Sequence, residues 1–326
     1  MPAILTHDFF GRDVLEDVTD LLGLSSAAEK DAFLLGNQGP DPLFYLVIDP
    51  LMHKWGPIGS KMHDTAPAPL LLAVREAVER LEGHERQVGR AYAAGFACHW
   101  LLDSTMHPFV YFWQNGICSA GVPGLDASAA PRVHAEIERD FDEMVLHAIT
   151  GRTVERWRPH ERVLSASRPT LAAIDKLYFY VALWVFGGAI DPRTFSTAVR
   201  EFRLVQRVLD SPSGRKRAAL SALERAVTRE PFSLVESMSH RARPQDTSDF
   251  DNREHRPWKN PFTGEVGDAS FWDLFDGARA RVLPVVDELF APGFDLAAAR
   301  ELTADLNFEG APKPPDSTEK GRGGAW

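Results

Sequence analysis

Apolar residues recur at helical spacing along most of the chain, and the period-two alternation typical of strands is almost absent. The segments with this pattern are predicted to be helices: Pro2–Leu22, Ala27–Leu35, Pro67–Glu82, Ala91–His107, Arg132–Ile149, Leu164–Ile190, Thr194–Leu209, Arg215–Arg229 and Ser270–Phe290. Pro108 is predicted to end the fourth helix, because proline lacks the N–H that a continuing helix needs. The pattern therefore predicts an all-α, multihelical protein.

The predicted helix Ala91–His107 is apolar or small at almost every position, as expected for a helix buried on all sides. His99, Asp103 and His107 are the exceptions, and they stand four residues apart. A step of four residues turns the side chain by only about 40° around a helix, so the three groups form one stripe. Buried imidazoles and carboxylates are costly unless they are paired, hydrogen-bonded or bound to a metal. We interpret the stripe as part of a metal site.

Further candidate ligands lie on other segments. His134 and Glu138 repeat the four-residue spacing on a second predicted helix, and His7 lies on the first turn of the first helix. Asp41 and His63 occupy loops rich in proline and glycine, and Pro42 favours an extended backbone at Asp41. Imidazole and carboxylate are ligands that zinc takes when no thiolate is offered. A metal-free imidazole–carboxylate pair is the alternative reading of His99 and Asp103 taken alone.

The order of these residues resembles the zinc-dependent phospholipase C family. The motifs that carry the resemblance are Thr6-His7, Gly39-Pro40-Asp41, Met62-His63, His99 to Pro108, and His134 to Glu138. The likeness extends to about residue 145 and is thinner beyond it, where it rests on 257–261 and 271–275. The resemblance implies a multihelical fold related to that of the zinc-dependent single-strand nucleases.

The resemblance also implies two or three Zn²⁺ ions and a ligand set for each. The first ion would use His63, His99 and Asp103, with Asp41 beside it as ligand or general base; the second would use His107, His134 and Glu138; a third would use His7, Asp103 and an amino-terminal Trp. This chain departs from the family in beginning Met1-Pro2, and in an Asp103–His107 interval two residues shorter than in secreted members.

The activity implied is that of a zinc-dependent phosphoric diester hydrolase, in which a metal-bound hydroxide attacks the phosphorus of a small phosphodiester or a phospholipid head group. Asp41 is the expected catalytic acid/base. Two alternatives stay open. One is a nuclease or phosphomonoesterase on the same metal site, and the other is a metal-binding helical protein without turnover.

The amino-acid composition limits the classes of molecule that the protein is expected to bind. The 36 basic and 46 acidic residues give a net charge of −10, which argues against a long nucleic acid as ligand. The two cysteines do not make a disulfide framework. Leu177–Ile190 is shorter than the roughly 20 residues that a membrane span needs, so we expect a core helix there. No signal peptide is apparent, and a cytoplasmic protein is expected. Nothing in the sequence sets the oligomeric state.

No linker divides the chain, so residues 1–310 are expected to form one domain, with the metal ligands in 1–150 and a helical remainder in 151–310. Residues 311–326 are polar and rich in proline and glycine, and are predicted to be a disordered tail. The segment Arg241–Asp268 is predicted to be a long polar loop, which in a compact domain is usually functional or disordered.

Overall fold

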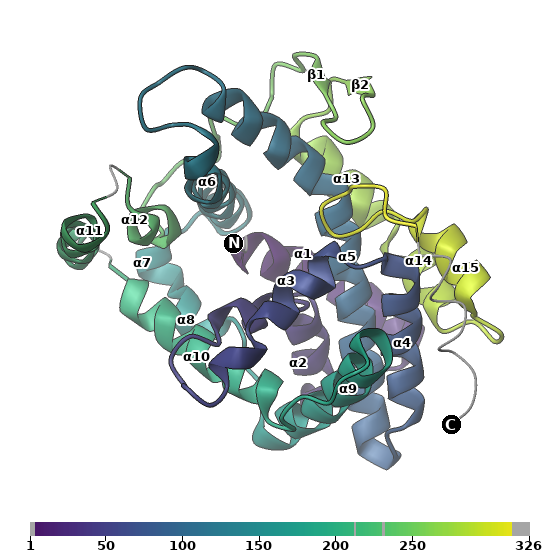
Figure 1. Cartoon of the computed structure of the whole chain (residues 1–326). Helices are drawn as coiled ribbons and strands as arrows, with labels where there is room; N and C mark the ends of the chain where they lie inside the picture. Colours follow the sequence, from purple (N-terminus) through teal and green to yellow (C-terminus); the bar gives the residue numbers. More distant parts are fainter. Residues whose placement is uncertain (1–3, 212, 230–231, 315–326) are drawn as a thin grey trace.

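A computed structural model describes residues 4–211, 213–229 and 232–314 (Figure 1). Helix accounts for 67% and strand for 2%, so the predicted all-α class is confirmed. The longer helices are α1 (Ile4–Leu22), α2 (Ala27–Gly36), α3 (Pro57–Asp64), α4 (Pro67–Glu79), α5 (Gly83–Cys118), α6 (Ala130–Thr150), α9 (Arg168–Phe186), α10 (Thr194–Leu209), α11 (Arg215–Thr228), α13 (Phe271–Ala280), α14 (Val282–Leu289) and α15 (Leu296–Thr303). Shorter pieces are η1 (Asp41–Tyr45), η2 (His53–Trp55), η3 (Ala127–Ala129), α7 (Val154–Trp157), α8 (Pro159–Arg162) and α12 (Leu234–Met238).

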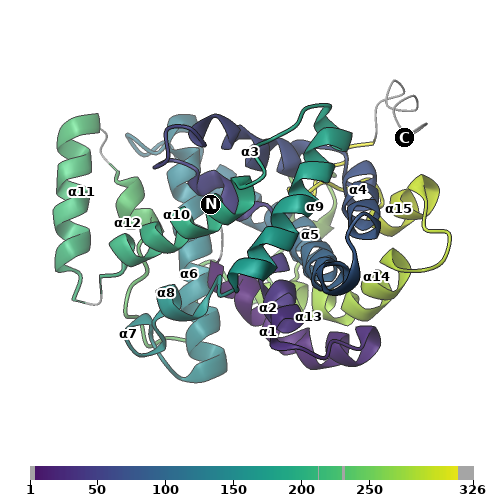
Figure 2. The same cartoon turned by 90° about the horizontal axis from the view of Figure 1, so that it is seen from below.

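Helix α5 runs through the middle of the molecule, and α1, α2, α4, α6, α9, α13 and α14 all pack against it (Figure 1). Its middle part is buried on every side, as its apolar sequence predicts. Figure 2 shows α11 and α12 at one edge of the molecule and α15 at the opposite edge. The helix that carries the predicted polar stripe is therefore the centre of the fold.

The predicted end of the central helix at His107 is wrong, because α5 continues through Pro108 to Cys118. The reason is burial of the residues that follow. Phe109 is fully buried, and the centre of its ring lies 6.2 Å from that of Phe141 of α6 and 5.1 Å from that of Trp258. A proline inside a helix costs about 3 kcal/mol, and burying an aromatic ring with two aromatic neighbours offsets a cost of that size.

Helices α2 and α5 approach closely because glycine stands at both contact points. A Cβ on Gly36 would lie 2.3 Å from the carbonyl oxygen of Tyr92, and one on Gly95 would lie 2.1 Å from that of Phe33. No side chain fits at either distance. The contact brings the turn that follows α2 down onto the stripe of α5, one helical turn after Gly95.

Other boundaries differ where local signals were ambiguous. The loop predicted around His63 is instead helix α3, because Pro57 stands at the first helical position, where its missing N–H costs nothing. The predicted helix Leu164–Ile190 is shorter, since Ser167 caps α9 and the helix ends at Phe186. The predicted helix Ser270–Phe290 is broken at Arg281 into α13 and α14.

The polar segment 241–268 is ordered. Arg241 and Arg243 both bind Asp140 of α6, and the segment contains a hairpin of β1 (Trp258–Lys259) and β2 (Val266–Gly267), the one named sheet in the described residues. At the other end of the chain, the backbone N–H of Lys313 donates to the carbonyl of Asp305 at 2.6 Å. The rest of the predicted tail, 315–326, lies outside the described residues.

Among the described helices, α9 alone is long and apolar enough to cross a membrane by length and composition. It packs against α4, α5 and α10, and 44% of its most apolar window is buried in the molecule. The expectation of a core helix at Leu177–Ile190 stays a prediction.

Candidate metal centre

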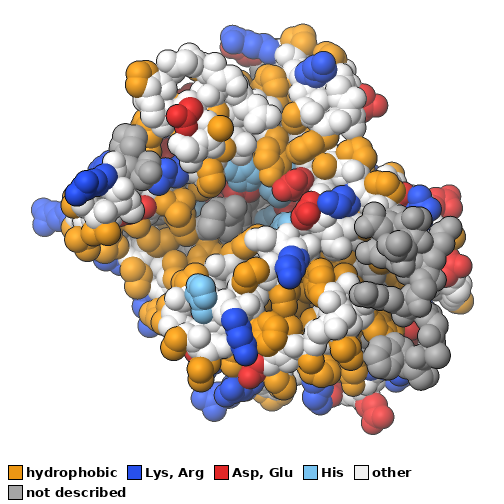
Figure 3. All heavy atoms as spheres, viewed as in Figure 1, with side chains coloured by type: hydrophobic (Ala, Val, Ile, Leu, Met, Phe, Trp, Pro, Cys, Tyr) orange, Lys and Arg blue, Asp and Glu red, His pale blue; other side chains and the backbone are white. Residues whose placement is uncertain are grey.

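The structure brings all eight predicted ligands together, although they come from five elements. They are His7 on α1, Asp41 on η1, His63 on α3, His99, Asp103 and His107 on α5, and His134 and Glu138 on α6. Figure 3 shows histidine side chains deep in a hollow near the centre of one face. Three sets have their ligand atoms within 4.8 Å of one another: His7, Asp41 and His99; His63, His99 and Asp103; and His107, His134 and Glu138. We call His7, Asp41, His63, His99 and Asp103 the inner group, and His107, His134 and Glu138 the outer group.

Asp103 is the hub of the inner group. Its Oδ1 lies 3.0 Å from Nε2 of His7, and its Oδ2 lies 3.1 Å from Nε2 of His99 and 3.8 Å from Nε2 of His63. The same Oδ1 is 3.8 Å from Nδ1 of His107, which links the two groups. Burial alone would raise the pKa of Asp103, but the neighbouring imidazoles outweigh burial and hold that pKa well below its usual value. The carboxylate is ionised.

Asp41 is held by the turn that precedes it. The carbonyl of Gly39 accepts hydrogen bonds from the hydroxyls of Tyr92 and Tyr178, each at 3.0 Å. Both tyrosines are fully buried, so this turn is fixed against α5 and α9. The extended backbone predicted at Asp41 is wrong, because Asp41 is the first residue of the 3-10 helix η1. The backbone N–H of Asp41 donates to the carbonyl of Gln38 at 3.1 Å, and this turn outweighs the local preference that Pro42 imposes. A buried aspartate in a fixed turn can present one oxygen to a defined point in space.

The Oδ1 oxygen of Asp41 faces two imidazoles. Oδ1 of Asp41 lies 3.0 Å from Nε2 of His63 and 3.7 Å from Nε2 of His99. Burial would raise the pKa of Asp41, but the two histidines lower it below its ordinary value. Asp41 is therefore a carboxylate that can accept a proton, as a general base requires.

His7 reaches the inner group because the start of α1 is tied to α6. The carboxylate of Asp142 accepts the backbone N–H groups of Leu5 and Thr6 at 3.0 and 2.7 Å, and the hydroxyl of Thr6 at 2.8 Å. His240 approaches the same carboxylate at 2.8 Å. His240 therefore contacts the carboxylate that anchors α1.

Four of the histidines use Nδ1 in the same way. The partner is always an uncharged oxygen: the carbonyl of Gly59 for His63 (2.8 Å), that of Asn37 for His99 (3.0 Å), that of Phe308 for His107 (2.6 Å), and the side-chain oxygen of Gln114 for His134 (2.9 Å). An oxygen acceptor keeps a ring proton on Nδ1, so Nε2 is the nitrogen that faces the site and binds a metal when it carries no proton. Metal-binding histidines in proteins are oriented by such bonds.

His99 gives the sharpest test of whether a cation fits. Its ring is completely buried, and Nε2 has no hydrogen-bond partner among the residues that the structure describes. With the proton on Nδ1, the Nε2 lone pair faces the carboxylates of Asp103 and Asp41 at 3.1 and 3.7 Å. Three electron-rich atoms at these distances repel one another unless positive charge lies between them. The donor set fits a divalent cation.

The outer group is smaller and more open. Oε1 of Glu138 lies 3.4 Å from Nε2 of both His107 and His134. Burial lowers the pKa of His107, but Asp103 and Glu138 outweigh burial and raise it to about 9. Burial lowers the pKa of His134, which favours the neutral ring that a metal needs. The carbonyl of Phe308, from the loop after α15, accepts a hydrogen bond from Nδ1 of His107.

The residues that orient the imidazoles are the part of the centre that sequence reasoning missed. Gln114 had a usable signal, because it stands seven residues after His107 and continues the polar stripe of α5. Asn37, Gly59 and Phe308 act through backbone carbonyls, which no residue type reveals. Cys98 is not a ligand: it belongs to none of the three sets, and burial raises the pKa of its thiol.

Comparison of the chain with protein-family models, with curated proteins and with solved structures gave no match. The interpretation of the centre therefore rests on its geometry and on the residue pattern.

Proposed function

We propose that this protein is a zinc-dependent phosphoric diester hydrolase similar to phospholipase C. The observation that carries the proposal is the shared arrangement of four imidazoles, each with Nδ1 on an uncharged oxygen and Nε2 turned toward carboxylates. Imidazole and carboxylate ligands without thiolate are typical of hydrolytic zinc sites. Two such groups, joined through Asp103, suit a substrate that presents more than one oxygen to cations.

The two groups have separate roles in holding the metal. His63, His99 and Asp103 of the inner group would hold one zinc, and the outer group would hold a second. Bound zinc supplies Lewis acidity, which neutralises phosphate oxygens and lowers the pKa of water. His7 donates to Asp103 through Nε2 at 3.0 Å, so we assign it to orienting that carboxylate or to a further ion.

Asp41 is the residue we assign to proton transfer. It is ionised, it lies at hydrogen-bond distance from His63, and η1 holds its oxygen at the edge of the inner group. A carboxylate in this position accepts a proton from the attacking water and returns it to the leaving alkoxide. The charge of −10 favours a small diester or a lipid head group over a long polyanion.

The test begins with metal content. The purified chain, reconstituted with zinc and measured by elemental analysis, should hold about two zinc ions, and a value below about one would end the proposal. The loaded protein is then given a chromogenic phosphodiester, phosphatidylcholine vesicles and single-stranded DNA. Hydrolysis of the diester or lipid is expected, and preference for DNA would favour the nuclease alternative.

Asp41→Asn separates an enzyme from a metal-binding protein. The amide keeps the size of the side chain but cannot take up the proton, so we expect zinc to be retained and the hydrolysis rate to fall about 10²- to 10⁴-fold. Asp246→Asn is the matched control, because Asp246 is exposed on the polar segment far along the chain from every proposed ligand. Equal rates for both variants would remove Asp41 from the mechanism.

A further inference from the structure

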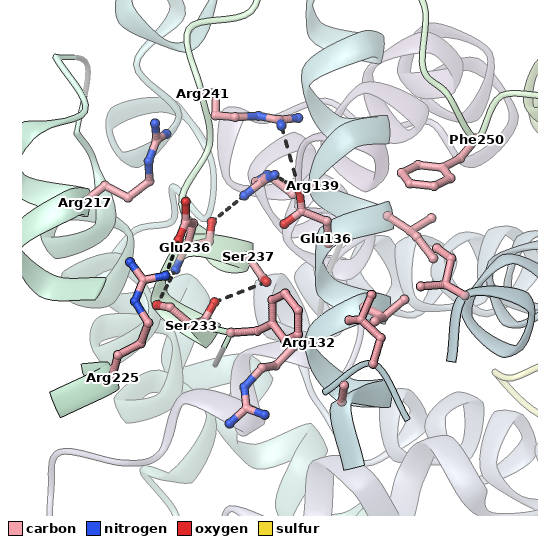
Figure 4. Close-up of a pocket in the computed structure, with 16 residues that line it drawn as sticks. Arg132, Glu136, Arg139, Arg217, Arg225, Ser233, Glu236, Ser237, Arg241 and Phe250 are labelled. Atoms are coloured by element: carbon pink, nitrogen blue, oxygen red, sulfur yellow. Dashed lines mark hydrogen bonds and ion pairs between the residues drawn. The ribbon is translucent and has the colours of Figure 1, made fainter. Parts of the chain in front are cut away.

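A second cavity lies on the side of α6 that faces away from the metal centre. It has a volume of about 420 Å³, within the range of small-molecule sites in proteins. Its walls come from the ends of α5 and α6, from α11 and α12, and from Phe250 (Figure 4). We call it the α6–α11 pocket. His134 and Glu138 leave α6 toward the metal centre, whereas Glu136 and Ile137 line this pocket, so the two sites share only the helix.

One side of the α6–α11 pocket is rich in arginine. Its lining includes five arginines and two glutamates, and Figure 4 shows Arg217 and Arg225 on the α11 side with Arg139 and Arg241 nearer α6. Arg225 pairs with Glu236 at 3.3 Å, and Arg241 pairs with Glu143 at 2.8 Å. Carboxylates outside the lining also pair with these arginines, because Glu143 contacts Arg139 and Arg241, and Asp140 contacts Arg241.

Arg217 is the side chain in this pocket that is best placed to bind an anion. Its side chain is half-buried, and its one hydrogen bond in the described residues runs to the carbonyl of His240 at 3.5 Å, an oxygen without formal charge. Among the described residues the Arg217 side chain has no carboxylate partner, and a guanidinium binds carboxylate or phosphate oxygens through paired hydrogen bonds.

The other half of the pocket is apolar. Ile117 and Leu125 line it from the end of α5 and the turn that follows, and Val133 and Ile137 line it from α6. Phe250 closes this side, opposite the α11 arginines in Figure 4. A ligand that fills the pocket must carry negative charge at one end and hydrocarbon at the other.

We propose that the α6–α11 pocket binds a small anionic amphiphile, a carboxylate or phosphate monoester that carries an alkyl chain. The anionic head lies between Arg217 and Arg225, and the chain lies along Leu125, Val133 and Ile137. The site is independent of the metal centre, and binding does not require zinc.

Calorimetric titration of the full chain with four probes tests the chemistry. Octanoate and octyl phosphate are expected to bind, and the tighter of the two identifies the head group. Acetate lacks the chain and 1-octanol lacks the charge, so each is expected to bind at least about tenfold more weakly than octanoate. The melting temperature should rise with octanoate concentration, in the metal-free and the zinc-loaded protein alike.

Paired variants locate the ligand. Arg217→Gln with Arg225→Gln should weaken octanoate binding about tenfold or more and leave 1-octanol unaffected. The matched control is Arg215→Gln with Lys216→Gln, which removes two charges from exposed positions of the same helix that do not line the pocket. Leu125→Asp should weaken octanoate and octyl phosphate together.

Three results would overturn the proposal. The first is no binding of octanoate or octyl phosphate at millimolar concentration. The second is equal weakening by the two double variants, which would mean that overall charge attracts the anion rather than the pocket. The third is unchanged binding in Leu125→Asp. Circular dichroism of each variant confirms that it is folded before it is compared.

Discussion

The inner and outer groups of the metal centre use the same side-chain chemistry but are supported differently. The inner group draws residues from α1, η1, α3 and α5, and its side chains are between 0% and 12% exposed. The outer group draws only on α5 and α6, with side-chain exposures of 7% to 14%. It also depends on a carbonyl from the far end of the chain. A site held by many independent elements is rigid. A site held by few elements is sensitive to the loss of any one contact.

The largest effect should come from Asp103, which touches both groups. Asp103→Asn removes the shared negative charge while keeping the shape of the side chain. We expect loss of zinc from the inner group and a fall in diester hydrolysis on the order of 10³-fold or more. Glu138→Gln, measured beside it by elemental analysis, should remove only the outer zinc. If Asp103→Asn retained its full zinc content, the hub role would be wrong.

pH should act mainly on the outer group. The folded-state pKa of His107 is raised from 6.5 to about 9, so the metal-free ring is protonated at pH 7 and zinc must displace that proton. Zinc affinity of this group should therefore rise roughly tenfold per pH unit from pH 7 toward 9. Titration in buffers of different ionisation enthalpy measures the proton released. Binding without proton release at pH 7 would contradict the assignment.

The same shift predicts how the metal-free protein responds to pH. Because the folded pKa of His107 exceeds its unfolded value, the protonated ring stabilises the fold fully below pH 6.5, and this contribution is lost as pH rises through about 9. Denaturant unfolding of the chelator-treated protein at pH 6 and pH 9 should show lower stability at the higher pH.

Gln114→Leu tests the support of the outer group alone. The variant removes the oxygen that accepts from Nδ1 of His134 but leaves every proposed ligand in place. Loss of such an orienting partner typically lowers metal affinity 10- to 100-fold. The inner group should be unaffected, because its rings use other acceptors. Equal loss of both zinc ions would show that the groups are not separable.

The smallest effect should come from Gly310→Ala, which acts on the loop that covers His107. Gly310 has φ of +70°, and an added Cβ would lie 2.5 Å from Cγ of Pro108 and 2.6 Å from the carbonyl oxygen of Ser104. We expect a destabilisation of about 1–3 kcal/mol by denaturant unfolding. Gly293→Ala is the control for backbone strain, since Gly293 has φ of +85° and no atom of the described residues lies within 4 Å of the added Cβ. Equal losses would exclude a role for the contact with Pro108.

Helix positions were predictable where apolar spacing was regular. Thr194–Leu209 begins and ends as predicted, and Gly151 ends α6 with φ of 63°, the conformation that favours glycine there. Prediction was wrong where local and tertiary preferences oppose each other. Pro108 is a strong local signal for a helix end, but burial of Phe109 between Phe141 and Trp258 outweighs it.

Residue identity and spacing were sufficient to select the eight groups of the candidate centre, because 3.6 residues per turn places His99, Asp103 and His107 on one side of any helix that contains them. The orientation of the imidazoles could only come from packing. The acceptor for His99 lies 62 residues away and that for His107 lies 201 residues away, and both are backbone carbonyls. The periodicity of a helix can be predicted from the order of its side chains. Contacts between backbone atoms that are distant in the sequence depend instead on how the helices pack.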